Sequence, residues 1–215
     1  MDSSGSTSGV SWNVAVDGSD MSEIAFKLIF KSLIKIEDFM TVSHVFSNSK
    51  DYLSHVFKPE YIKQHFESLL IGTHFTKWAL IWEHLEKGLT TKEHIMKIAD
   101  EAKANFLVLG YHGRKGPKEN PTLLGSAVEY MAHNPVCPTI VVKTNEDRED
   151  KENGAFRWLV CTDGSEKSYK SLRETIKIMD KEKDEIITLV VNLATINIKN
   201  TEKDTNKIIE EEDVK

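Results

Sequence analysis

Strand-forming runs alternate with amphipathic helical segments along residues 13–143, and this alternation constrains the fold of the 215-residue chain more than any other feature. Strands are expected at 13–17, 39–46, 76–82, 106–109 and 139–143, and helices at 19–36, 58–70, 91–103 and from about 125 to 133. Thr90 followed by Glu93 predicts a capping box at the start of the third helix. Strands joined by helices run parallel through right-handed crossovers. The pattern therefore predicts an α/β domain with a five-stranded parallel sheet and helices on both faces.

A glycine-rich basic loop follows the fourth expected strand. Its residues of interest are Gly110, Gly113, Arg114, Gly125 and Ser126, the last two at the expected start of a helix. Glycine lets main-chain N–H groups approach an anion, and a helix N-terminus adds unpaired donors and a favourable dipole. The segment is a candidate phosphate site. A connecting loop in which Gly110 and Gly113 only permit positive φ is the alternative. The Ser126 hydroxyl can cap the helix while its N–H and oxygen still face a phosphate.

The first expected strand ends in a carboxylate, Asp17, which is followed by Gly18 and Ser19. Two interpretations are open. Asp17 can satisfy N–H groups where the next helix begins, or it can contact a ligand, because parallel sheets bind ligands at the carboxyl ends of their strands.

Taken in order, these segments resemble the universal stress protein family. Its nucleotide-binding members carry G-x-x-G, nine residues and then G-[ST], and the chain has Gly110-x-x-Gly113 and then Gly125-Ser126. It departs from that spacing, because residues 114–124 number eleven and include two prolines. The resemblance implies the strand order 3-2-1-4-5 of a Rossmann-like sheet.

The resemblance also implies a function. It places Asp17 beside the adenine and ribose of ATP and the main chain of Val45 at the adenine, with Mg²⁺ accompanying the nucleotide. The implied binding residues are Asp17, Val45, Gly110, Gly113, Arg114, Gly125 and Ser126. The family would make the chain a nucleotide-dependent stress-response regulator or interaction module that pairs as a homodimer through residues 139–143. The alternative is a non-nucleotide-binding dimeric interaction protein of the same fold.

Catalytic and metal-binding patterns are not visible in the sequence. It lacks a nucleophile with a paired base and the G-x-x-x-x-G-K-[ST] phosphate loop, so catalysis would be at most slow, Mg²⁺-dependent ATP hydrolysis. A true enzyme of the wider adenine-nucleotide hydrolase group is a third possibility. The eight histidines form no H-x-x-x-H spacing, so no metal site is expected.

Composition excludes several other classes. The net charge of −6 and the lack of a basic face argue against nucleic acid. No apolar run approaches the length of a membrane span, and residues 1–9 lack the features of a secretory signal. A cytoplasmic protein with two buried, reduced thiols, Cys137 and Cys161, is expected.

An internal repeat begins after the first domain. Trp158–Ser168 matches Trp12–Ser22 at an offset of 146 residues, and a strand, a helix over 166–180 and a strand over 186–191 are expected before a polar, acidic end. The expected parts are a flexible arm at 1–9, a universal stress protein domain at 10–144, a charged linker at 145–155, a truncated second repeat at 156–198 and an acidic tail at 199–215. Because the repeat lacks a glycine loop, any phosphate site belongs to the first domain.

Overall fold

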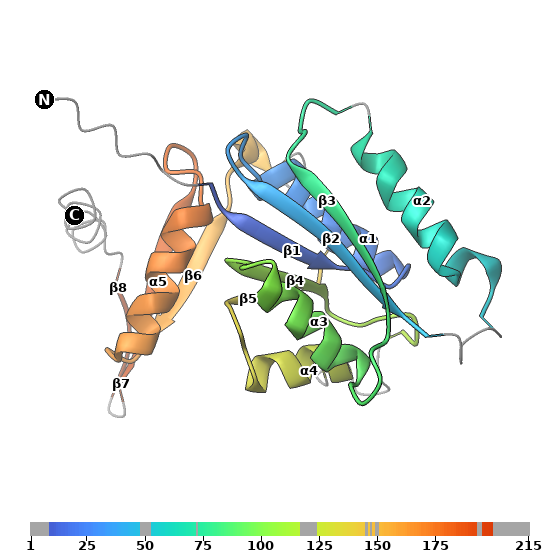
Figure 1. Ribbon diagram of the computed structural model, residues 1–215. Helices are drawn as coiled ribbons and strands as arrows, with labels where there is room; N and C mark the ends of the chain where they lie inside the picture. The colour runs from blue at the N-terminus through green and yellow to red at the C-terminus, as the bar shows by residue number, and fades with distance from the viewer. Residues whose placement is uncertain are drawn as a thin grey trace, which may run out of the picture. The chain divides into compact units, whose positions relative to one another are not determined.

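The computed structural model describes residues 9–47, 53–71, 73–116, 124–144, 146, 148, 151–192 and 195–199 (Figure 1). Residues 1–8 of the arm expected at 1–9, and the tail expected at 199–215 from residue 200 onward, lie outside the described residues. The chain divides into two compact units, Met1–Asn145 and Glu146–Lys215, and each unit holds its own sheet.

The first unit contains a five-stranded sheet in the order β3-β2-β1-β4-β5, and every neighbouring pair is parallel. Its strands are β1 (Ser11–Ala15), β2 (Phe39–Phe46), β3 (Trp78–His84), β4 (Phe106–Gly110) and β5 (Thr139–Val142). The predicted α/β sheet and its order are confirmed. Two strands are displaced by two residues from their expected ranges. β1 lies earlier than the expected 13–17, and β3 lies later than the expected 76–82 because its pairing with β2 starts at Trp78 opposite Met40.

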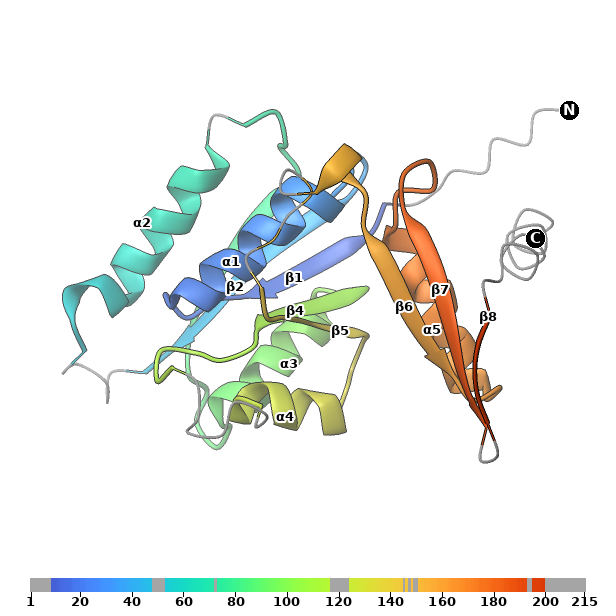
Figure 2. The ribbon, with the colours of Figure 1, turned by 180° about the vertical axis from the view of Figure 1, so that it is seen from behind.

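Helices cover both faces of this sheet. They are α1 (Asp20–Leu28), continued by a π-helix (Ile29–Leu33), α2 (Pro59–Leu70), α3 (Thr91–Glu101) and α4 (Ser126–His133). Figures 1 and 2 show α1 on one face and α3 with α4 on the other. The predicted capping box of Thr90 and Glu93 is present at the start of α3. No helix among the described residues is both long and apolar enough to cross a membrane.

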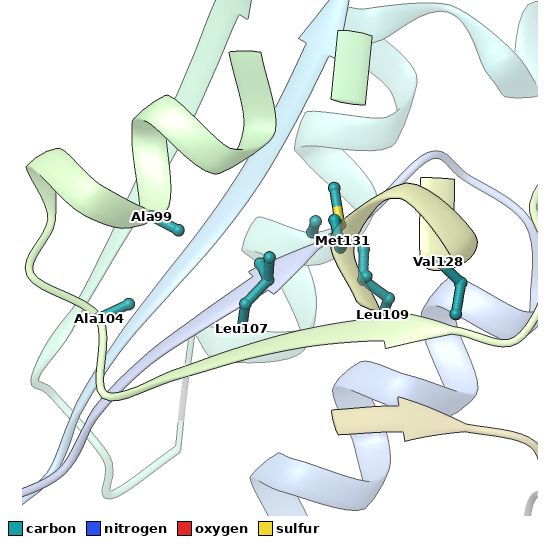
Figure 3. Packing of buried hydrophobic residues seen from close by; sticks show 7 residues of the cluster. Ala99, Ala104, Leu107, Leu109, Val128 and Met131 are labelled. Carbon is teal, nitrogen blue, oxygen red and sulfur yellow. The ribbon is translucent and has the colours of Figure 1, made fainter. Parts of the chain in front are cut away.

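A layer of small and aliphatic side chains fills the space between the sheet and the helices α3 and α4 (Figure 3). Its buried members are Ala15, Ala99, Ala104, Leu107, Leu109, Val128 and Met131. Small residues on the sheet and on α3 allow the helices to approach closely, and burial of the aliphatic groups stabilises the unit. This packing fixes the start of α4 near the end of β4, where the glycine-rich loop lies.

A buried carboxylate ties the beginning of β1 to the residues before β2. Asp38 accepts hydrogen bonds from the N–H of Val10 at 2.7 Å, the indole N–H of Trp12 at 3.0 Å and the N–H of Lys35 at 2.9 Å. Sequence analysis did not identify Asp38, although continuing the 146-residue offset would have paired it with Asp184. The contact sets where both strands begin.

The second unit is a three-stranded sheet with one α-helix among its described residues. Its elements are β6 (Arg157–Thr162), α5 (Glu166–Ile178), β7 (Glu185–Asn192) and β8 (Thr195–Lys199). β6 and β7 are parallel, whereas β8 pairs antiparallel with β7. The strand β8 was not expected from the polar sequence around Asn197. Its place beside β7 corresponds to the place of β3 beside β2 in the first unit.

Candidate functional site

Asp17 lies just past the carboxyl end of β1, where the chain leaves the sheet for α1. Its Oδ1 accepts hydrogen bonds from the main-chain N–H and the hydroxyl of Ser19, at 3.1 and 2.6 Å. Ser19 is the N-cap of α1 and accepts from the N–H of Ser22 at 3.3 Å. Asp17 therefore supports the start of the helix through one oxygen, which leaves the other for a different contact.

The second oxygen of Asp17 binds the glycine-rich loop. The N–H of Arg114 donates to Asp17 Oδ2 at 3.0 Å, across 97 residues of sequence. The Arg114 Nε lies 3.9 Å from the same oxygen, and its guanidinium carbon lies 5.9 Å from the ring centre of Phe57. Thus Asp17 and Arg114, both predicted site residues, are neighbours, and Arg114 stays close to the loop instead of extending into solvent.

Gly110 and Gly113 are needed for close approach, not for positive φ. A Cβ at Gly113 would lie 2.5 Å from Asp17 Oδ2, and one at Gly110 would lie 2.8 Å from the main-chain carbonyl of Met21 in α1. The alternative that these two glycines permit positive φ is wrong. In this loop the positive φ, +74°, falls on Gly116, whose N–H donates to the Gly113 carbonyl at 2.9 Å.

The helix α4 begins at Ser126, as expected, but its first turn is not capped in the expected way. Its N-cap is Gly125, and no side chain caps the first turn, so the predicted cap by the Ser126 hydroxyl is wrong. Ser126 is the first helical residue and is exposed. A Cβ at Gly125 would lie 3.1 Å from the carbonyl oxygen of Tyr111, which explains the glycine by packing. Without a side-chain cap, the first-turn donors of α4 have to be satisfied by other groups.

Val45 lies near the carboxyl end of β2, on the far side of β1 from β4. Its side chain is buried, as expected of a strand valine. His44, the preceding residue, is buried too, and its Nδ1 lies 2.7 Å from the carbonyl oxygen of Val16. A carbonyl can only accept, so Nδ1 carries the proton in this contact. The carboxyl ends of β1, β2 and β4 thus bring Asp17, Val45 and Gly110 to one edge of the sheet.

Two residues of this edge were missed by sequence analysis. Phe57, in the short 3-10 helix His55–Phe57, supports Arg114, and its ring lies 3.4 Å from a Cβ built on Gly18. His44, the residue before Val45, was not assigned a role. No local pattern identifies Phe57, because its partner Arg114 is 57 positions away along the chain. Lys118, Pro117 and Pro121 lie outside the described residues.

The two cysteines differ in exposure. Cys137 is half-buried against the layer of Figure 3, and burial raises the pKa of its thiol. Cys161 in β6 is exposed, so the expectation of two buried thiols is wrong for it. Among the described residues, no group of three or more His, Cys, Asp or Glu side chains could hold a metal ion.

The site therefore offers groups suited to a nucleoside phosphate. A partly exposed carboxylate can accept from hydroxyl groups, while an arginine and a helix start without a side-chain cap favour negative charge. The main chain at the end of β2 adds groups that can read a base edge.

Comparison with known proteins gives the following matches. The model of the universal stress protein family matches residues 13–143. None of the curated proteins matches the chain. Three solved structures illustrate the likeness. The universal stress protein UspA from Lactobacillus plantarum is 18% identical, with 62% of this chain and 97% of that chain covered and a TM-score of 0.44.

The second is a universal stress protein family protein from Arabidopsis thaliana with AMP bound. It is 15% identical, with 67% of this chain and 97% of that chain covered and a TM-score of 0.41. The third is a universal stress protein in complex with cAMP, 15% identical, with 64% of this chain and 99% of that chain covered and a TM-score of 0.44.

Proposed function

The chain belongs to the universal stress protein family, and from this premise we propose that its first unit binds ATP with Mg²⁺. The proposed site is the edge of the sheet formed by the ends of β1, β2 and β4, together with the start of α4. The nucleotide would then control a surface that another protein recognises, in a cytoplasmic stress response.

The contact between Asp17 and the loop after β4 carries this proposal. The hydrogen bond from the Arg114 N–H to Asp17 Oδ2 joins the strand-end carboxylate to the Gly110-x-x-Gly113 segment of the family motif. Ligands of doubly wound sheets bind where neighbouring strands send the chain in opposite directions over the sheet, and β1 and β4 meet at that place here. A sugar hydroxyl can donate to the Asp17 carboxylate from the open side of the site.

The remaining groups suit the other parts of the nucleotide. The start of α4 has no side-chain cap. Arg114 directly follows Gly113, so its guanidinium belongs to the glycine-rich loop. Both favour phosphate oxygens. Mg²⁺ is expected to arrive with the phosphates, since nucleotide-bound Mg²⁺ keeps several waters and needs few protein ligands. When bound, it would neutralise phosphate charge.

Calorimetric titration with ATP, with and without Mg²⁺, tests the proposal, and AMP and cAMP complete the nucleotide series. We expect saturable heat for the wild type. Asp17→Ala should weaken ATP binding by roughly tenfold or more, because the proposed contact with a sugar hydroxyl and the anchor of the loop are both lost. A helical circular dichroism spectrum like that of the wild type would show that the fold survives.

The second unit supplies a matched control. Asp163 stands 146 residues after Asp17 and accepts from the N–H of Ser165 at 2.9 Å, but the second repeat has no glycine-rich loop to bind it. Asp163→Ala should therefore change the ATP affinity by less than about twofold. Absence of any binding heat for the wild type at millimolar ATP would refute the proposal and favour the interaction protein that binds no nucleotide.

Glycine substitutions are less suitable as tests. Gly125→Val would place its side chain against the Tyr111 carbonyl, 3.1 Å from the new Cβ, so lost binding could follow from altered packing alone. The same holds for Gly113, whose Cβ would meet Asp17. A loss of ATP affinity in these variants would not separate phosphate contact from loop distortion.

We also propose a homodimer through β5, as the family resemblance implies. β5 is the last strand of its sheet, and an edge strand presents unpaired N–H and C=O groups to another chain. The bonds from Leu107 N–H to Pro138 O and from Tyr111 N–H to Val142 O show that alternate residues face β4, so the Val141 N–H points outward. Strand pairing between two copies would use that N–H.

Light scattering tests the dimer. Val141→Pro removes an outward N–H and leaves the bonds to β4, so it should shift the wild-type dimer to a monomer at tens of micromolar. Val142→Lys is unsuitable because Val142 is buried. A monomeric wild type would contradict the edge-pairing arrangement.

A further inference from the structure

The hydrogen-bond ladder between β1 and β2 ends one hydrogen bond earlier than the register of the two strands would allow. The N–H of Phe39 donates to the Val10 carbonyl, and the N–H of Val16 donates to the Ser43 carbonyl, each at 2.9 Å. Odd-numbered residues of β2 thus direct their main chain toward β1. Continued by steps of two, the same register would direct the Val45 N–H to the Val16 carbonyl.

That last bond is not formed in the described part of the chain. The pairing of β1 with β2 ends at Ala15 opposite Ser43. The Val16 carbonyl instead accepts from His44 Nδ1 at 2.7 Å. The Val45 N–H has no hydrogen-bond partner among the described residues, although the Val45 side chain is buried. The histidine side chain has replaced the main-chain donor at this carbonyl.

The second unit shows what happens without the histidine. At the offset of 146 residues, Val190 stands in the place of His44, and Thr162 stands in the place of Val16. There the parallel pairing continues one step further, to Thr162 opposite Val190. Valine has no donor that could compete for the Thr162 carbonyl. The longer ladder in the second unit and the shorter ladder in the first unit therefore correlate with the side chain at this one position.

His44 is held in place by its neighbours. Its ring stacks near Phe46, with centroids 6.2 Å apart, and lies at a tilt to Trp82, with centroids 5.6 Å apart. Only 3% of His44 is exposed, so the ring has little freedom to leave the Val16 carbonyl. This packing makes the interrupted ladder a stable feature of the first unit.

We propose that His44 is a positioning residue for base recognition. By occupying the Val16 carbonyl, it keeps the Val45 N–H out of the ladder, and this N–H is then available to a ring nitrogen of the base. Adenine presents an acceptor at N1, whereas guanine presents an N–H there, so the free donor favours adenine. The inference rests on the nucleotide site proposed above and adds the residue that sets its base preference.

Two substitutions separate the donor from the ring. His44→Asn keeps an N–H at nearly the position of Nδ1 and removes the aromatic ring, whereas His44→Phe keeps a ring and removes the donor. In His44→Phe the Val16 carbonyl becomes free to accept from Val45. We expect amide hydrogen exchange of Val45 to slow at least about tenfold in His44→Phe relative to the wild type, and to stay fast in His44→Asn.

Nucleotide titrations give the second readout. The wild type should prefer ATP to GTP, His44→Phe should lose roughly tenfold of that preference, and His44→Asn should keep it. Tripolyphosphate, which has no base, should bind the wild type and both variants alike. This readout separates a role in base selection from general destabilisation, which would weaken all three ligands together.

The outcomes distinguish the inference from the function on which it rests. A wild type that binds no nucleotide would overturn both. A wild type that binds ATP, combined with a His44→Phe variant that still prefers ATP as strongly, would overturn the role of His44 alone. Equal Val45 amide exchange in the wild type and His44→Phe would overturn it as well.

Discussion

The second unit repeats the central contact of the first unit but strengthens it with a charge. Asp184 accepts from the Phe156 N–H, the Trp158 indole N–H and the Asp180 N–H, each at 2.9 Å. Asp38 also accepts three hydrogen bonds in the first unit. Its donors Val10 and Trp12 correspond to Phe156 and Trp158, whereas the third donor is Lys35. Only Asp184 is also bound by an arginine, Arg148, through two hydrogen bonds of 2.5 and 2.7 Å.

The arginine comes from the segment that sequence analysis expected to be a charged linker. Arg148 also lies over the ring of Phe156, 4.5 Å from its centre, and its N–H donates to the Gly154 carbonyl at 2.8 Å. A small unit buries a smaller fraction of its surface and gains less from its core. The comparison teaches that the smaller unit compensates with fixed polar contacts around Asp184.

The two units also differ on the sheet face opposite α1 and α5. In the first unit this face carries Asn13, which is fully buried beneath α3 and α4. In the second unit the equivalent residue is Leu159, and 61% of it is exposed. By register, Ile187 stands next to Leu159 on that face. The position is therefore polar in the first unit, where helices cover Asn13. It is apolar in the second unit, whose described residues include no helix over Leu159.

The largest effect is expected from removing the carboxylates. Asp184→Ala leaves the Arg148 guanidinium and the Trp158 indole without their acceptor, and breaking such a buried pair should lower the free energy of unfolding by roughly 3–5 kcal/mol. Asp38→Ala loses three neutral donors and should cost about 3 kcal/mol. Chemical denaturation followed by tryptophan fluorescence measures both.

A neutral substitution nearby controls for these variants. Glu182→Ala changes an exposed residue of the same turn, so its effect should stay within about 0.5 kcal/mol. If Asp184→Ala proved no more costly than Asp38→Ala, the idea that the arginine compensates for the smaller unit would fail.

The next largest effect is expected from acid, which should destabilise the second unit through protonation of Asp184. Burial alone raises the pKa of Asp184, but the Arg148 contact and the donors from Phe156 and Trp158 outweigh it and hold that pKa well below the ordinary value of 3.8. A lowered pKa stabilises the folded unit fully above about pH 4. This stabilisation is lost progressively as the pH falls from there toward the lowered pKa.

We therefore expect the denaturation midpoint of the second unit to fall steeply below about pH 4, and Arg148→Gln to flatten that dependence. Amide exchange resolved by residue, measured from pH 6 down to pH 2.5, checks it. An unchanged pH profile in Arg148→Gln would show that the arginine does not control the titration.

A smaller effect is expected at the glycines that precede the N-cap serines of α1 and α5, Ser19 and Ser165. Gly18 and Gly164 both have a φ of +81°. A Cβ on Gly18 would lie 2.9 Å from Ile62 in α2, whereas one on Gly164 would meet nothing within 4 Å. Alanine at Gly164 should cost about 1–2 kcal/mol for the backbone alone. Alanine at Gly18 should cost roughly 1 kcal/mol more, because its Cβ would overpack against Ile62. Thermal melts measure both variants, and equal losses of stability would mean that α2 moves aside at no cost in free energy.

The smallest effect is expected at Leu159. Leu159→Lys should change the free energy of unfolding of the second unit by less than about 0.5 kcal/mol, because the side chain is mostly exposed. The converse exchange, Asn13→Leu, deprives the Ser43 hydroxyl of the oxygen to which it donates at 2.7 Å and should cost roughly 1–3 kcal/mol. A costly Leu159→Lys would reveal that this face is covered in solution.

Sequence by itself determined the elements that depend on neighbouring residues. The range of β2, 39–46, was predicted to the residue, and so was the capping box of Thr90 and Glu93. The repeat at 146 residues is visible because it needs only matching side chains in order. The family resemblance added the strand order, which periodicity could not supply, since any order of parallel strands has the same periodicity.

Tertiary structure alone decided what these residues do at the site. The bond from Arg114 to Asp17, the collision that keeps a Cβ off Gly113 and the exchange of donors at the Val16 carbonyl join segments far apart along the chain. Such contacts depend on distances of a few tenths of an ångström after the sheet has formed. Sequence patterns record which residues recur at short spacing, whereas hydrogen bonds and steric contacts between distant segments are set by how the strands and helices pack.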